Sequence, residues 1–193
     1  MSTERLKAFS DGVIAIIITI MVLELKPPHD TTLAALTSLA PVFFCYVLSF
    51  IYVGIYWNNH HHLMNIAQNV NGAILWANLH LLFWLSLIPF VTAWMGENHF
   101  AMIPVALYGL VLLMAAVAYY FLTLALIKEH GKESHLATAI GNDFKGKISV
   151  VIYLAAILLT FLNARLGFAL YICVAVMWLI PDRRIEKECS VKQ

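Results

Sequence analysis

The sequence predicts an all-α integral membrane protein with six transmembrane helices in each chain. Hydrophobic residues make up 62% of the 193 residues and charged residues only 12%, whereas soluble domains carry about 25% charged residues. The apolar residues gather in six long stretches, and the basic residues fall mainly in alternate connections between them. We therefore expect a single domain, residues 1–193, that spans a lipid bilayer several times.

The first apolar stretch begins with polar residues. Its uninterrupted apolar run, Val13 to Leu23, has eleven residues, while a helix needs about 20 residues to cross the hydrocarbon core. We therefore place the first helix at about 6–25, which brings Ser10 and Asp11 to the membrane edge or into the membrane. An ionised carboxylate is costly there, so Asp11 requires polar partners on neighbouring helices.

Five further stretches have the length and composition of membrane helices. The polar connections between them contain the Pro, Gly and Asn residues typical of loops, and a longer polar link follows Lys128. The six helices are expected at about 6–25, 39–58, 72–95, 101–127, 147–163 and 166–181.

The distribution of Lys and Arg predicts the orientation. An even number of spans places both termini on one side, and cytoplasmic loops carry an excess of basic residues. With the N- and C-termini in the cytoplasm, only Lys26 and Arg165 of the 12 basic residues lie outside. The basic residues then inside are Arg5, Lys7, Lys128, Lys132, Lys145, Lys147, Arg183, Arg184, Lys187 and Lys192.

The predicted first helix has two different faces. A helix turns about 100° per residue, so Asp11 points about 140° and Ser10 about 120° away from Ile16. Both polar side chains therefore turn toward whatever packs behind the helix. The opposite face is a largely apolar stripe that lies within about 60° of Ile16; it contains Arg5, Phe9, Gly12, Ile16, Thr19, Ile20 and Leu23.

Polar side chains on the second and third helices are available to Asp11. Trp57, His60 and His61 lie near the end of the second helix, and Asn78 lies in the third. Together with Arg5, Phe9, Ser10 and Asp11 they can tie the first helix to its neighbours, or Trp and His can form an interfacial belt at a helix end. Three consecutive His residues cannot share one helical face, and the three Cys residues have no metal-ligand spacing, so no metal site is predicted.

These residues together resemble a known family. Arg5, Phe9, Ser10 and Asp11 form an RxxxFSD arrangement at the start of an isoleucine-rich helix that ends in VLELKPP. This is similar to the signature of the transmembrane protein 175 family of potassium channels. The segments YWNNHH (56–61) and LWANLHLLFWLSLIPFVTAWMG (75–96) also resemble that family, with His62 and His80 as departures from its pattern.

The resemblance implies a potassium-permeable cation channel that lacks a cofactor and conducts K⁺ through a central pore. Four six-helix units would surround that pore, so this chain would form a homotetramer with its first helix lining the axis. The sequence contains no TVGYG loop, hence no carbonyl filter of the usual potassium-channel kind is expected. The resemblance points instead to a hydrophobic side-chain constriction that serves as filter and gate, formed by Ile16, Thr19, Ile20 and Leu23.

Other functions remain open from the residues alone. A proton-coupled membrane transporter can use an Asp and His network near the membrane, and a membrane enzyme or a purely structural protein is also compatible with it. Arg5 can anchor the helix at the headgroups or cap the pore mouth or pair with Asp11. The net charge of +1 argues against nucleic acid as a partner. A single-repeat chain of this kind indicates a multi-pass protein of a prokaryotic plasma membrane, and not an enzyme.

Overall fold

The computed structural model describes residues 3–67, 69–131 and 143–179, and in these ranges all regular structure is helical. Four of the helices, with α4 and α5 counted as one span, are long and apolar enough to cross a membrane: Thr3–Leu23, Ala40–Ile66, Gly72–Glu97 and Met102–His130. The helices are α1 (Thr3–Leu23), α2 (Leu33–Ser38), α3 (Ala40–Ile66), α4 (Gly72–Ser86), α5 (Ile88–Glu97), α6 (Met102–His130), α8 (Phe144–Thr160) and α9 (Ala164–Leu179).

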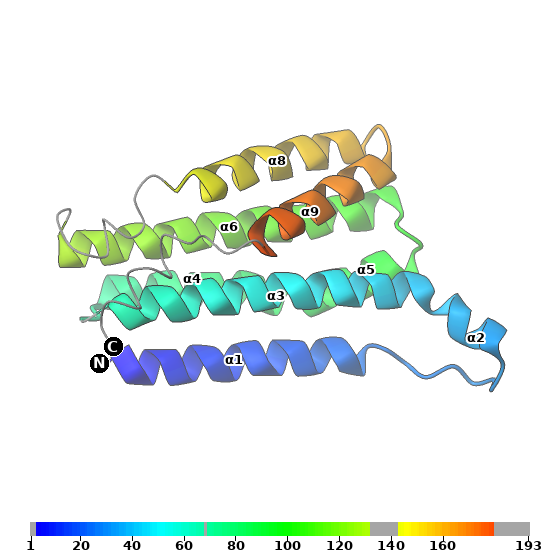
Figure 1. The fold of residues 1–193 in the computed structure, drawn as a ribbon, viewed down its shortest axis with the longest axis horizontal. Helices are drawn as coiled ribbons and strands as arrows, with labels where there is room; N and C mark the ends of the chain where they lie inside the picture. Colours follow the sequence, from blue (N-terminus) through cyan, green and yellow to red (C-terminus); the bar gives the residue numbers. More distant parts are fainter. Residues whose placement is uncertain (1–2, 68, 132–142, 180–193) are drawn as a thin grey trace.

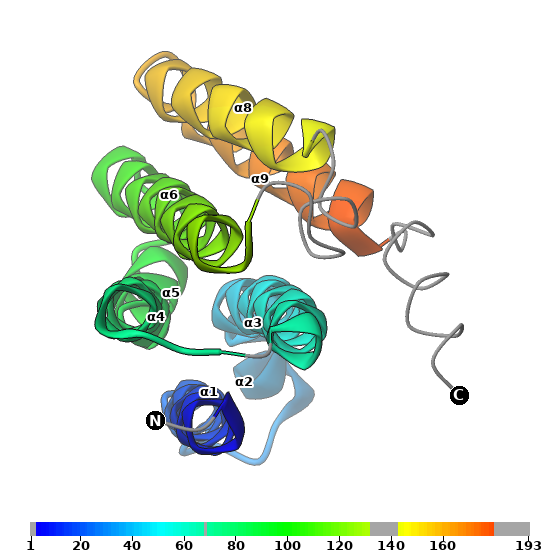
Figure 2. The same ribbon diagram turned by 90° about the vertical axis from the view of Figure 1, so that its left-hand side faces the viewer.

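The long helices run side by side along the longest axis of the molecule (Figure 1). Helix α1 forms one edge of the bundle, and the α8–α9 hairpin forms the opposite edge (Figures 1 and 2). Between these edges, α1 packs against α3, α4 and α5, while α6 packs against α4, α5, α8 and α9. Helix α1 is therefore covered by the rest of the chain on one side only.

Side-chain caps begin three of the helices. The side chains of Thr32, Asn71 and Asp143 accept hydrogen bonds from the backbone N–H groups of the residues three positions later, at 3.2, 3.0 and 2.9 Å. Such caps satisfy backbone donors that have no partner within the helix. These residues explain why α2, α4 and α8 begin where they do.

Several helix limits differ from those expected from hydropathy. Helix α3 continues from the expected end at 58 to Ile66, because polar residues beyond the apolar run remain helical. The stretch expected at 72–95 is divided at Leu87 into α4 and α5. Pro89 lies in the first turn of α5, where its missing N–H is tolerated but would interrupt a continuous helix. The short helix α2 was not expected.

The last three helices also differ in their limits. Helix α6 covers 102–130 where 101–127 was expected, α8 covers 144–160 where 147–163 was expected, and α9 covers 164–179 where 166–181 was expected. The Asp143 cap places the start of α8 earlier in the chain than hydropathy predicts. Hydropathy locates the centre of a membrane helix, but polar residues at its ends continue the same backbone hydrogen bonds.

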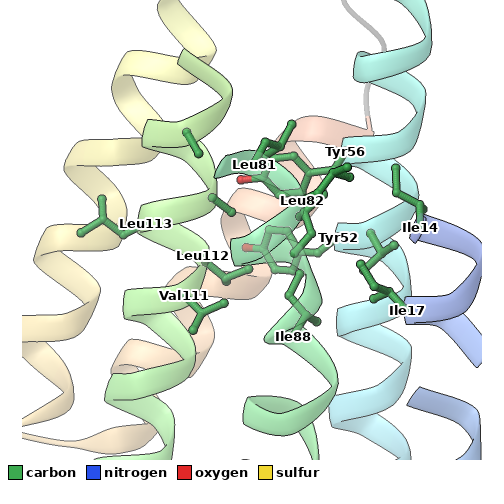
Figure 3. Close-up of a cluster of buried hydrophobic side chains, with 14 of the residues drawn as sticks. Ile14, Ile17, Tyr52, Tyr56, Leu81, Leu82, Ile88, Val111, Leu112 and Leu113 are labelled. Atoms are coloured by element: carbon green, nitrogen blue, oxygen red, sulfur yellow. The ribbon is translucent and has the colours of Figure 1, made fainter. Parts of the chain in front are cut away.

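The core is apolar, with polar groups that satisfy one another. Figure 3 shows Ile14 and Ile17 of α1 pointing toward α3, beside a cluster of buried side chains from α3 to α6. Within this core the Ser49 hydroxyl lies 2.7 Å from the Thr92 hydroxyl and 3.0 Å from that of Tyr108. Among the described residues, every fully buried side-chain N or O atom has a hydrogen-bond partner. Water is absent from a bilayer core, so such internal pairing stabilises the packing of helices.

Helix α6 approaches α9 closely at Gly109. A β-carbon added to Gly109 would overlap the hydroxyl group of Tyr171, and that hydroxyl donates a hydrogen bond to the Val105 carbonyl at 3.3 Å. The ring of Tyr171 is fully buried, so it has little space in which to move.

We expect Gly109→Ala to lower the stability of the folded chain by about 1–3 kcal/mol, the usual cost of overfilling a packed core. The measurement is the thermal midpoint of the purified protein in mild detergent. Gly54→Ala is the matched control, because a β-carbon there meets nothing within 4 Å and Ala favours the helix. Equal midpoints for the two variants would contradict the close approach of α6 and α9.

Candidate functional site

The two faces of α1 have opposite environments. The residues turned toward the chain's interior are buried: Leu6, Ser10, Ile14, Ile17 and Met21. On the other face the exposed fractions are 59% for Ile16, 42% for Ile20 and 71% for Leu23. Burying large aliphatic side chains is favourable in water, so an exposed row of them indicates contact with lipid or with another protein surface.

Two further residues belong to the exposed face of α1. Thr19 is exposed, and its hydroxyl donates a hydrogen bond to the Ala15 carbonyl at 2.9 Å. This bond uses the hydroxyl hydrogen and leaves oxygen lone pairs on the exposed side. Phe9 is 51% exposed. The apolar face of α1, defined as Phe9, Ile16, Thr19, Ile20 and Leu23, is thus continuous along most of the helix.

A chain of hydrogen bonds holds the buried face of α1 to α3 and α4. The Asn78 side-chain amide donates to the Ser10 hydroxyl at 3.0 Å, and the Ser10 hydroxyl donates to the Leu6 carbonyl at 2.9 Å. The Asn78 carbonyl oxygen lies 2.7 Å from Nε2 of His60. Because that oxygen can only accept, His60 must carry a proton on Nε2. Ser10, Asn78 and His60 are all buried.

A second polar contact holds Asp11. The Trp57 indole Nε1–H donates to Oδ1 of Asp11 at 3.0 Å, and the ring of His61 lies 5.8 Å from that of Trp57. A carboxylate at a membrane edge is stabilised by a donor of this kind. We call these two sets of contacts, Ser10–Asn78–His60 and Asp11–Trp57, the polar anchors of α1.

The remaining residues expected in this network do not join the polar anchors. Arg5 is exposed, and the ion pair found among the described residues of α1 joins Lys7 to Glu4 at 3.4 Å. His61 contacts the Trp57 ring but has no hydrogen bond to Asp11 among the described residues. The His that bonds to Asn78 is His60. Successive residues of a helix point about 100° apart, so only one of three adjacent His residues can face α4.

The position of His60 could have been found from the sequence. Val53, Tyr56 and His60 follow one another at intervals of three and four, and the structure buries all three. That spacing defines the inward face of a helix. Among the described residues, no group of three or more His, Cys, Asp or Glu is arranged to hold a metal ion.

Comparisons with known proteins place this geometry in a family. Residues 5–89 match the family described as endosomal/lysosomal potassium channel TMEM175. The chain is 54% identical over 187 residues to a protein of Chryseobacterium sp. (strain P1-3) named as a potassium channel, and the match covers 97% of each chain. The polar anchors and the whole apolar face of α1 therefore lie within the region that matches the family.

Two other relatives agree with this result. The crystal structure described as a lysosomal potassium-selective channel TMEM175 homolog from Chamaesiphon minutus has a TM-score of 0.81 and 28% identity, covering 92% of this chain and 96% of that chain. A human protein named endosomal/lysosomal proton channel TMEM175 is 35% identical over 86 residues, which cover 38% of this chain and 17% of the human one. The near full-length match at 54% identity and the matching fold lead to one conclusion: the chain belongs to the TMEM175 family.

Proposed function

We propose that this protein is a potassium-permeable cation channel, assembled as a homotetramer in a prokaryotic plasma membrane. Each chain would contribute six transmembrane helices, with both termini in the cytoplasm. The names of its bacterial relatives support potassium as the permeant ion. Of the basic residues that favour this orientation, Lys132, Arg183, Arg184, Lys187 and Lys192 lie outside the described residues.

The observation that carries the proposal is the uncovered apolar face of α1. The polar anchors hold the opposite face, so α1 presents Ile16, Ile20 and Leu23 outward from the edge of its own chain. Four chains arranged around an axis would bring four copies of this face together. The same face in a single chain could contact lipid, as exposed apolar side chains of the other helices do. The position of this face within the region that matches the channel family supports a protein partner instead.

Ion selection would depend on side chains and not on peptide oxygens. The Val-Gly-Ile-Tyr run at 53–56 is not such a filter, because it lies within helix α3, where backbone carbonyls bond along the helix. A ring of four Ile16 side chains excludes water when it is narrow and becomes wet when the helices separate slightly. Potassium sheds part of its hydration shell more easily than sodium, so such a ring would favour potassium.

The alternative function is proton-coupled transport through the Asp and His residues. The human relative's name as a proton channel makes this alternative worth testing. In the structure, the hydrogen-bond chain from His60 leads through Asn78 and Ser10 to the backbone carbonyl of Leu6. A backbone carbonyl does not release a proton onward, and this favours a structural role for the polar anchors.

The direct test is the reversal potential of the purified full-length protein in liposomes under a potassium and sodium gradient. A potassium-permeable channel gives single-channel current steps. Its reversal potential is shifted from zero toward the equilibrium potential of potassium. A separate proton gradient tests proton passage in the same liposomes. Saturable flux with a fixed ion stoichiometry and no current steps would refute the channel proposal in favour of the transporter.

We expect Ile16→Asn to increase the single-channel conductance severalfold or to reduce selectivity, because a polar ring wets more easily than an aliphatic one. Ile103→Asn is the matched control, since Ile103 of α6 is 55% exposed but lies on a different helix. The measurement is the single-channel conductance of the two variants in planar bilayers. Unchanged currents in Ile16→Asn, with normal assembly, would remove Ile16 from the ion path.

We expect Thr19→Ala to change the ratio of potassium to sodium permeability, because the exposed hydroxyl oxygen of Thr19 can contact a partly hydrated cation. Thr19→Ser retains the hydroxyl and should retain the original ratio. The readout is the bi-ionic reversal potential. A ratio that stays the same in Thr19→Ala would leave this side chain with a packing role alone.

We expect Asp11→Ala to destabilise the assembled protein by about 1 kcal/mol while leaving ion preference nearly unchanged, because it removes the partly exposed hydrogen bond from Trp57. Asp30→Ala, a change at an exposed Asp, serves as the control. In a double-mutant cycle, adding Trp57→Phe should cost little beyond Asp11→Ala alone. A larger effect on selectivity than on the thermal midpoint would place Asp11 in the ion path.

A further inference from the structure

A cavity of about 310 Å³ lies between α3, α6, α8 and α9, on the side of the bundle away from α1. Its volume is at the lower end of the range of about 300–1,000 Å³ found for small-molecule pockets. The walls are mainly aromatic and aliphatic. The lining residues are Tyr52, Ile55, Tyr56, Asn59, Ala116, Val117, Tyr119, Tyr120, Asp143, Gly146, Lys147, Ser149, Val150, Tyr153 and Trp178.

Most polar groups on the cavity wall already have protein partners. The Tyr52 hydroxyl donates to the Tyr171 carbonyl at 2.5 Å, and the Tyr119 hydroxyl donates to the Asn59 carbonyl at 3.3 Å. The Trp178 indole N–H donates to the Ser149 hydroxyl at 2.9 Å. These contacts use the hydrogens of the three side chains, so none of them is free to donate to a ligand.

Tyr56 is different. Its side chain is only 9% exposed, and its ring contacts that of Tyr119, yet its hydroxyl has no hydrogen-bond partner among the described residues. Every fully buried side-chain oxygen in those residues does have a partner, so the Tyr56 hydroxyl must be open to space. Because Tyr56 of α3 is one of the residues that line the cavity, we infer that its hydroxyl is open to this cavity.

We propose that this cavity binds a small uncharged amphiphile from the membrane, with one hydroxyl or carbonyl oxygen hydrogen-bonded to Tyr56. An apolar wall favours an alkyl or aromatic body, and a charge would be costly to bury against it. A polar donor left unpaired in a mainly apolar site is costly too, and a ligand oxygen satisfies it. The ligand class is therefore long-chain alcohols, ketones and similarly sized neutral molecules that dissolve in lipid.

The test uses 8-bromooctan-1-ol and the intrinsic fluorescence of Trp178, because bromine quenches a nearby indole. The full-length protein is placed in liposomes, and the signal of Trp178 is the difference between the unmodified protein and Trp178→Phe. We expect quenching of this signal to saturate with probe concentration. Binding is read without ion flux, so the result is independent of the proposed channel function.

Two variants and one control variant test the geometry of the site. Tyr56→Phe removes only the hydroxyl and should weaken binding about fivefold, the effect of one neutral hydrogen bond. Tyr46→Phe, on the same helix but outside the lining, should not change it. Val117→Phe fills the cavity and should abolish saturable quenching.

Three outcomes bear on whether the probe binds in the cavity. Quenching that rises linearly with the probe, or that is the same in Val117→Phe, would show simple partition into the bilayer and overturn the proposal. Equal affinities of Tyr56→Phe and the unmodified protein would overturn the role of Tyr56. If Val117→Phe does not fold, as judged by circular dichroism, Val150→Phe fills the same cavity from α8.

Discussion

The rotation of α1 about its own axis is the constraint on which the rest of the structure depends. Ser10 and Asn78 are completely buried and bonded to each other, and Asp11 accepts from Trp57. If α1 rotated, buried donors and acceptors would lose their partners at a cost of about 1–3 kcal/mol each. Two anchors about one-third of the way along the helix therefore determine which side chains the helix presents outward.

The polar anchors and the exposed isoleucines occupy different halves of α1. The polar residues occupy the first half, where they interrupt the apolar run and tie the helix to α3 and α4. The second half carries exposed isoleucines and Leu23, with no polar group except Thr19. In this half Ile14, Ile17 and Met21 are buried against the rest of the chain, so apolar packing continues the hold on α1 that the anchors begin.

The all-helical fold and the two faces of α1 follow from composition and helical periodicity, because a membrane helix buries its polar residues wherever neighbours can satisfy them. The division at Leu87 was missed, although Pro89 signals it, because the apolar run continues through it. The sequence predicts both His60 and His61 in the polar network. Their spacing from Val53 and Tyr56 is the signal that identifies His60 as the buried one. The cavity could not be predicted, since its walls come from α3, α6, α8 and α9, and no local pattern specifies the space between distant helices.

The function proposed for this protein depends on where α1 lies in the assembled channel. The most direct measurement is a cryo-electron microscopy map of the full-length protein in lipid nanodiscs, at a resolution that shows side chains. We expect four chains around an axis, with the Ile16 side chains of α1 converging on it. A map in which Ile16 faces the surrounding lipid, while another helix lines the axis, would show that α1 does not form the pore.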